Sequence, residues 1–205
     1  MILLLARYTA DAQTQAGFEA YYYSETSSSL VPRVYFQSNS GWYGGASYNY
    51  VKGQTLSLCA GHTFSGQDSL SWSVTPSAGI LIGGFRGGSA GATATLNIRR
   101  LSFYTEEQYV VSTDKGKGDF LFSWTELGYQ LTQYLLIGIA LEHTSYAGID
   151  GKYDPGIRLC LSCKEWRFPV YVFSPLSTGR YVAMGMSRDW KYGKTTTHVK
   201  ATEIP

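Results

Sequence analysis

The chain has 205 residues, of which 44% are hydrophobic and 16% charged, and its formal net charge is +2. Aromatic residues make up 15%, which excludes a disordered chain. The near-neutral charge gives no electrostatic basis for binding nucleic acid. No stretch approaches the roughly 20 apolar residues of a transmembrane helix, so the chain is either one domain with a sizeable core or one barrel of moderate size.

The first residues resemble the end of a secretory signal sequence. Residues 2–5 are apolar, and Ala10, Asp11 and Ala12 form an A-x-A cleavage pattern. A basic segment is missing and the apolar run is short, as expected if translation starts further upstream. We interpret residues 1–12 as a residual signal-like segment, with an ordinary unstructured N-terminus as the alternative.

From residue 13 onwards, hydrophobic and small polar residues alternate with the two-residue period of β-strands. Turn residues separate these runs, and short connections alternate with longer ones. An even number of strands brings both termini to one side of a barrel. The pattern predicts about twelve strands, at residues 15–25, 31–38, 41–50, 54–64, 69–83, 90–99, 101–112, 119–130, 134–147, 155–163, 166–174 and 180–190.

Two of these strands fit the alternation poorly. In 101–112, Glu106 and Glu107 are adjacent, so one of them must face away from the polar side unless it lies at an interface or in a bulge. In 119–130, Phe120 and Trp124 share a face with Glu126, while other large residues lie opposite. We expect a bulge in this second strand.

The type of residue on each face favours a membrane barrel over a soluble sandwich. The more polar faces carry mostly glycine, serine, threonine and alanine, which suit the crowded interior of a barrel with apolar residues turned to lipid. Aromatic residues near strand ends are typical of interfacial girdles, and we assign to them Trp42, Trp72, Phe120, Phe122, Trp124, Tyr146, Trp166, Tyr181 and Trp190, among others. A secreted soluble β protein that binds glycans is the alternative.

The final strand, YVAMGMSRDW at residues 181–190, resembles the C-terminal strand of bacterial outer-membrane β-barrel proteins of the porin-like kind. The resemblance implies a closed antiparallel transmembrane barrel of about 12 strands over residues 13–190, located in the outer membrane. It also implies that Tyr181 and Trp190 form an assembly signal for the barrel-assembly machinery, and that outer-membrane lipid surrounds the protein. Residues 191–205 are then a polar tail, where such barrels usually end at the aromatic residue.

One pair of residues raises the alternative of an enzyme. His143 and Ser145 share the apolar face of their strand, which resembles the arrangement in outer-membrane phospholipases. The orienting asparagine of that family has no counterpart on the next strand, so a lipid hydrolase remains the minor hypothesis. Cys160 and Cys163 form a C-x-x-C pair, but residues three apart on a strand point to opposite faces. We therefore expect neither a metal nor a cofactor.

Charged residues on the small-residue faces predict the lining of a pore, and they are Glu19, Arg33, Arg99, Glu142 and Arg158. Glu142 and Arg158 lie on consecutive strands, and we expect them to form an ion pair. Because the charges nearly cancel, a pore lined by them should discriminate weakly between anions and cations. The sequence thus predicts a narrow passive channel for small solutes, or a structural barrel with no conducting role.

Overall fold

The computed structural model of the chain describes residues 14–24, 29–50, 53–147 and 151–192. The signal-like segment 1–12 and tail residues 193–205 lie outside the described residues. Within the described part, no helix is long and apolar enough to cross a membrane. The strands are β1 (Thr14–Tyr23), β2 (Ser29–Gln37), β3 (Trp42–Tyr48), β4 (Thr55–His62), β5 (Phe64–Gln67), β6 (Ser71–Gly83), β7 (Gly87–Ile98), β8 (Leu101–Ser112), β9 (Phe120–Gln130), β10 (Leu135–Tyr146), β11 (Lys152–Cys163), β12 (Trp166–Phe173) and β13 (Tyr181–Tyr192).

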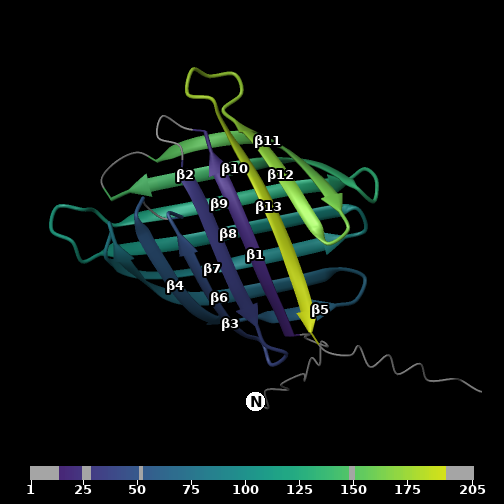
Figure 1. The fold of residues 1–205 in the computed structure, drawn as a ribbon, viewed down its shortest axis with the longest axis horizontal. Helices are drawn as coiled ribbons and strands as arrows, with labels where there is room; N and C mark the ends of the chain where they lie inside the picture. The colour runs from purple at the N-terminus through teal and green to yellow at the C-terminus, as the bar shows by residue number, and fades with distance from the viewer. Residues whose placement is uncertain (1–13, 25–28, 51–52, 148–150, 193–205) are drawn as a thin grey trace, which may run out of the picture.

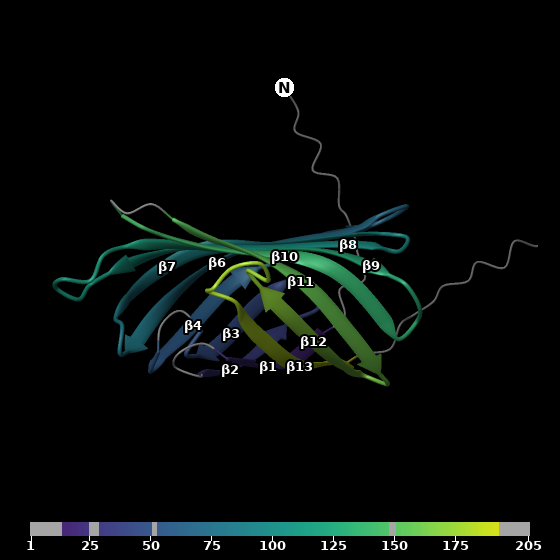
Figure 2. The same cartoon turned by 90° about the horizontal axis from the view of Figure 1, so that it is seen from above.

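The strands form one closed antiparallel ring, which Figures 1 and 2 show from two directions. Apart from β4 and β5, which do not pair with each other, each strand pairs with its neighbours in the chain, and β1 pairs with β13. Both β4 and β5 pair with β6, so they are two parts of one strand. The pairing is interrupted opposite Pro76, which has no N–H to donate. The result is a 12-strand barrel, and the predicted fold class is confirmed.

The two ends of the barrel differ. Thr14 pairs with Tyr192, so the first and last strands place both of their outer ends at one end of the barrel, called here the termini end. The turns at this end are residues 38–41, 68–70, 99–100, 131–134 and 164–165. Most connections at the opposite end, the loop end, are longer, and they comprise residues 24–28, 49–54, 84–86, 113–119, 147–151 and 174–180. The final strand continues two residues beyond the predicted end at Trp190.

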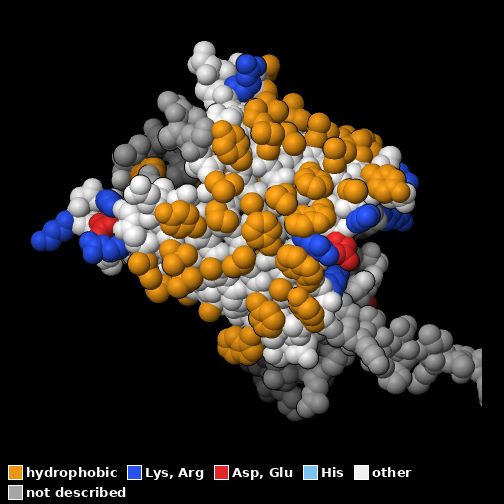
Figure 3. Space-filling model, viewed as in Figure 1, with side chains coloured by type: hydrophobic (Ala, Val, Ile, Leu, Met, Phe, Trp, Pro, Cys, Tyr) orange, Lys and Arg blue, Asp and Glu red, His pale blue; other side chains and the backbone are white. Residues whose placement is uncertain are grey.

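The outer wall is apolar. Large aliphatic side chains of the central strands point away from the interior, and about half or more of the side chain is exposed for Ile80, Ile139 and Ile157. Figure 3 shows hydrophobic side chains spread over the face formed by β1, β12 and β13, with charged groups gathered toward the margins. A soluble protein would bury these groups, since large exposed apolar patches mark an interaction surface. The structure therefore does not support the soluble alternative.

Strand β8 explains the adjacent glutamates without a bulge. Glu106 is buried and faces the interior, while Glu107 is exposed on the outer wall. Ser123 on β9 donates a hydrogen bond of 2.7 Å to the Glu107 carboxylate. The outward carboxylate is thus partly compensated by a neighbouring strand.

The expected bulge in 119–130 is absent, because β9 pairs continuously with both β8 and β10. Phe120 and Trp124 instead point inward, which corrects their assignment to an interfacial girdle. Tyr181 is also interior, with 5% of its surface exposed. The regular alternation of the strand is preserved because the interior accepts large aromatic rings near the loop end.

Those rings form two packed clusters inside the barrel near the loop end. One consists of Trp124, Ala140, Tyr171, Phe173, Tyr181 and Ala183. The other consists of Leu81, Phe85, Val110 and Phe120. The ring centroid of Phe173 lies 5.2 Å from the ring centroid of Trp124 and 4.9 Å from that of Tyr181. This half of the interior is therefore narrowed by packed side chains.

Candidate functional site: a polar cavity in the lumen

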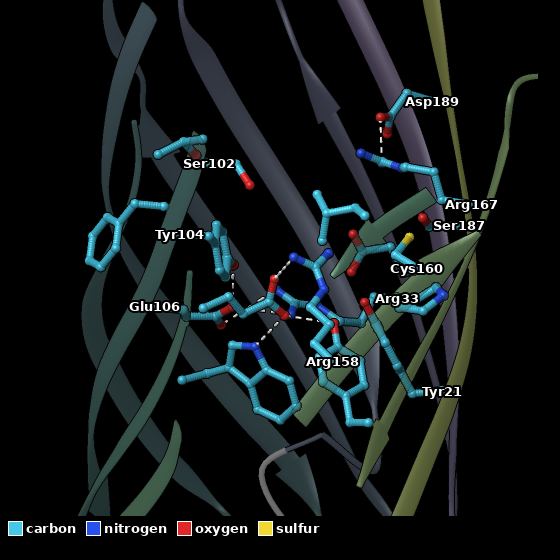
Figure 4. A pocket seen from close by; sticks show the side chains of 18 of the residues that line it. Tyr21, Arg33, Ser102, Tyr104, Glu106, Arg158, Cys160, Arg167, Ser187 and Asp189 are labelled. Atoms are coloured by element: carbon cyan, nitrogen blue, oxygen red, sulfur yellow. Dashed lines mark hydrogen bonds and ion pairs between the residues drawn. The ribbon is translucent and has the colours of Figure 1, made fainter. Parts of the chain in front are cut away.

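The other half of the interior contains a cavity of about 640 Å³. Its wall runs from residues near the termini end, such as Gln15 and Asp189, to the edge of the aromatic clusters at Trp124 and Tyr171. Figure 4 shows side chains from both sides of the barrel converging on it. Most of the lining side chains are polar, charged or tyrosine, so water and polar solutes can occupy the space.

One ion pair crosses the lumen. Arg33 on β2 and Glu106 on β8 come from opposite walls (Figure 2). The two guanidinium nitrogens of Arg33 lie 3.1 and 3.4 Å from the two carboxylate oxygens of Glu106. Tyr104 donates a further hydrogen bond of 2.8 Å to Glu106, and the Arg33 guanidinium lies 4.3 Å from the centroid of the Tyr50 ring. This crossbar, Arg33–Glu106, divides the cavity from a smaller space of about 40 Å³ beside β2, β3 and β4.

A second ion pair joins Arg158 to Glu126 at 2.7 Å. The same carboxylate accepts hydrogen bonds from Trp124 at 2.8 Å and Tyr171 at 2.6 Å. Both oxygens of Glu126 are therefore engaged, and the charged pair is fixed against the edge of the aromatic cluster. Charge-assisted bonds of this kind are shorter and stronger than neutral ones.

The expected pair between Arg158 and Glu142 is wrong. Arg158 lies opposite Gly138 in the β10–β11 hairpin, whereas Glu142 lies opposite Asp154. The two positions are four residues apart along the strands, which corresponds to about 13 Å. Glu142 instead accepts a hydrogen bond of 2.9 Å from Tyr181, within the aromatic half of the barrel.

A third ion pair lies toward the termini end. Arg167 on β12 and Asp189 on β13 are 2.7 Å apart. Tyr35 donates a hydrogen bond to the second oxygen of Asp189, and Gln15 donates one of 3.2 Å to the Tyr35 hydroxyl. This network connects β12, β13, β2 and β1 across the seam where the barrel closes.

Among the predicted pore residues, Glu19, Arg33 and Arg158 line the cavity. Glu142 lies beyond it, in the aromatic half. Arg99 is not part of the wall, because it occupies the exposed β7–β8 turn with a φ of 52°. The alternation of the preceding strand does not extend through such a tight turn, which explains why the sequence pattern wrongly predicted Arg99 as a pore residue.

Sequence reasoning missed four charged residues of the cavity, which are Glu106, Glu126, Arg167 and Asp189. Alternation already placed Asp189 on the same face as Ser187, which could have revealed it. Glu126 was obscured by the large aromatic residues on its face. The strand-by-strand pattern contained no information about which of these residues meet across the lumen.

The structure does not support the hydrolase alternative. The His143 ring stacks on Tyr153, with centroids 4.0 Å apart and planes inclined by 15°. No hydrogen bond joins His143 to Ser145 among the described residues, where a base and its nucleophile need that contact. In the same part of the chain, no group of three or more histidine, cysteine or acidic residues could hold a metal ion. Its cysteines are unpaired, with Cys160 buried and Cys163 exposed.

No protein-family model matches the chain, and no curated protein matches its sequence. Solved structures do resemble it. The KdgM porin superposes with a TM-score of 0.60 at 13% identity, covering 84% of this chain and 98% of that one. The NanC porin gives a TM-score of 0.54 at 9% identity, covering 87% and 100%. These likenesses establish the fold, a porin-like barrel.

Proposed function

We propose that this protein is a narrow passive channel for small solutes in the bacterial outer membrane. The observation that carries the proposal is the polar cavity of about 640 Å³ inside a closed barrel whose outer wall is apolar. The likeness to barrels named as porins supports it. An aqueous space enclosed by a membrane-spanning wall has the geometry needed for solute passage.

The interior also explains why such a channel would be narrow. The crossbar Arg33–Glu106 spans the lumen, and the aromatic clusters narrow the half near the loop end. Twelve strands lie between the eight-stranded barrels filled by side chains and the wide aqueous porins of sixteen or more strands. Small polar solutes fit this intermediate size, whereas large ones do not.

We further propose that the termini end faces the periplasm, because outer-membrane barrels have short periplasmic turns and longer outer loops. Trp190 then lies on the outer wall at the periplasmic side, where the Arg188 guanidinium is 5.2 Å from the centroid of its ring. This position is accessible to the barrel-assembly machinery and suits an assembly signal. The interior position of Tyr181 suits a packing role instead.

The test is conductance in planar lipid bilayers. Purified wild-type protein should give small, passive current steps. The double variant Arg33→Ala/Glu106→Ala removes both members of the crossbar together, so neither is left without the other, and its steps should be larger. A barrel that folds, as judged by a shifted gel band before heating, but is silent in both forms would contradict the channel and favour a structural role.

A further inference from the structure

The carboxylates of the cavity are not equivalent. In Glu106, Glu126 and Asp189, both oxygens are engaged by arginine, tyrosine or tryptophan donors. Glu19 also lines the cavity, yet it forms no hydrogen bond or ion pair with any described residue. It is therefore the one cavity carboxylate of the described chain that no donor or cation contacts at hydrogen-bonding distance.

The arginine opposite Glu19 in the sheet forms its ion pair with another carboxylate. Arg33 lies directly opposite Glu19 in the β1–β2 pairing, but its guanidinium extends across the lumen to Glu106. The other neighbour, Ser187 on β13, carries no charge. The cavity wall thus contains four carboxylates and three guanidinium groups, and one negative charge remains uncompensated when all are ionised.

Two tyrosine rings flank this carboxylate. Glu19 lies between Gly17 and Tyr21 on the inner face of β1. A Cβ at Gly17 would lie 2.2 Å from the Tyr35 ring, and one at Gly185 would lie 2.6 Å from the Tyr21 ring. The two glycines therefore allow both rings to lie flat against the wall beside Glu19. Ring faces attract cations, and together with a carboxylate they favour a small positively charged group.

We infer that Glu19 is a cation-binding site in the lumen that makes the channel prefer cations. Its ligands are small monovalent cations, either an alkali ion or the ammonium group of a small solute. The binding site stands on the cavity geometry alone, whereas the preference in conduction rests on the proposed channel function. This inference replaces the weak selectivity expected when the inward charges cancel.

Sodium-23 NMR relaxation tests the site without requiring any current. In a zwitterionic detergent, wild-type protein should broaden the Na⁺ signal, and Glu19→Gln should lose most of that broadening. Glu107→Gln is the matched control, because it removes the same charge from the outer wall. Equal broadening by wild type and Glu19→Gln, both folded by gel shift, would overturn the site.

Competition identifies the ligand. Adding ethylammonium chloride or KCl to the wild-type sample should displace bound Na⁺. Stronger displacement by ethylammonium would identify an ammonium site supported by the tyrosine rings, and equal displacement would identify a general site for monovalent cations. If neither salt displaced Na⁺, the inference would be wrong.

Bilayer recordings under a KCl gradient test the effect on conduction. Wild type and Glu107→Gln should conduct K⁺ severalfold better than Cl⁻, and Glu19→Gln should bring the permeability ratio close to one. An unchanged ratio in Glu19→Gln would contradict the selectivity. Absence of current in every form would contradict the channel, and the NMR result would then decide the binding site separately.

Discussion

The two halves of the lumen differ in how inward side chains occupy the space inside the barrel. Toward the loop end, rings such as Phe173 and Tyr181 pack against one another and narrow the lumen. Toward the termini end, charged residues pair across strands and leave a cavity of about 640 Å³. Both halves are built from inward positions of the same strands. The difference shows that side-chain size and charge at inward positions, rather than barrel geometry, determine where a small barrel is open.

The largest expected effect comes from the packed half. Phe173→Ala removes a side chain with 0% exposure from contact with Trp124 and Tyr181. It should lower the free energy of unfolding by about 3–5 kcal/mol, the usual cost of such a truncation. Urea unfolding in detergent measures this change in the free energy of unfolding. Phe168→Ala on the same strand is the control, because Phe168 is exposed on the outer wall and should cost clearly less.

Arg158→Glu tests the boundary between the halves. The new carboxylate would face Glu126, which would lose its ion pair and gain a repulsive neighbour. Loss of a charged hydrogen bond alone lowers the free energy of unfolding by about 1.5–3 kcal/mol. The ion selectivity of the current should also shift further toward cations. Unfolding and reversal potentials measure the two effects. The double variant Arg158→Glu/Glu126→Arg restores opposite charges and should recover part of the stability; no recovery would argue against direct pairing.

The two predicted assembly residues lie in different places, Trp190 on the outer wall and Tyr181 in the packed half of the lumen, and they should differ in their effect on assembly. Trp190→Ala should slow insertion into outer membranes severalfold, because an aromatic residue at the end of the last strand is lost. Tyr181→Phe should leave the insertion rate unchanged, since the ring stays in place and the hydroxyl that donates to Glu142 is removed. Pulse-chase assembly followed by gel shift measures both. Deletion of residues 193–205 should also leave insertion unchanged, and a block by this deletion would contradict the placement of the signal.

The smallest effect concerns the loop end outside the lumen. Hydrogen bonds from Lys117 and Arg86 hold the pKa of Asp114 below its usual value. The stabilisation of this loop is therefore present above the ordinary aspartate pKa and is lost as the pH falls through the lowered one. Asp114→Asn should increase proteolysis within residues 113–119 at neutral pH without changing barrel unfolding. Equal proteolysis of both proteins would show that these contacts do not order the loop.

Much of the fold could be predicted because each strand shows its own pattern. Leu56 and Leu58 alternate with small polar residues, and the predicted and observed strands there agree closely. Predictions of contacts between residues on two different strands were less accurate. The pairing of Arg158 with Glu126 rather than Glu142 depends on the register of β9, β10 and β11 together. The pattern of one strand shows which face a residue lies on, but it does not show which residue of another strand will contact it.

By itself, the sequence determined that the chain forms alternating strands with one apolar face, because period-two patterning is a local property. It favoured a membrane barrel but left the soluble alternative open. It also determined that charged residues such as Glu19 and Arg33 face the interior. Only the tertiary structure decided that Arg33 reaches across to Glu106 and forms no ion pair with Glu19, within the described residues. That outcome depends on the closure of the ring, which brings β2 and β8 to opposite walls within reach of one long side chain.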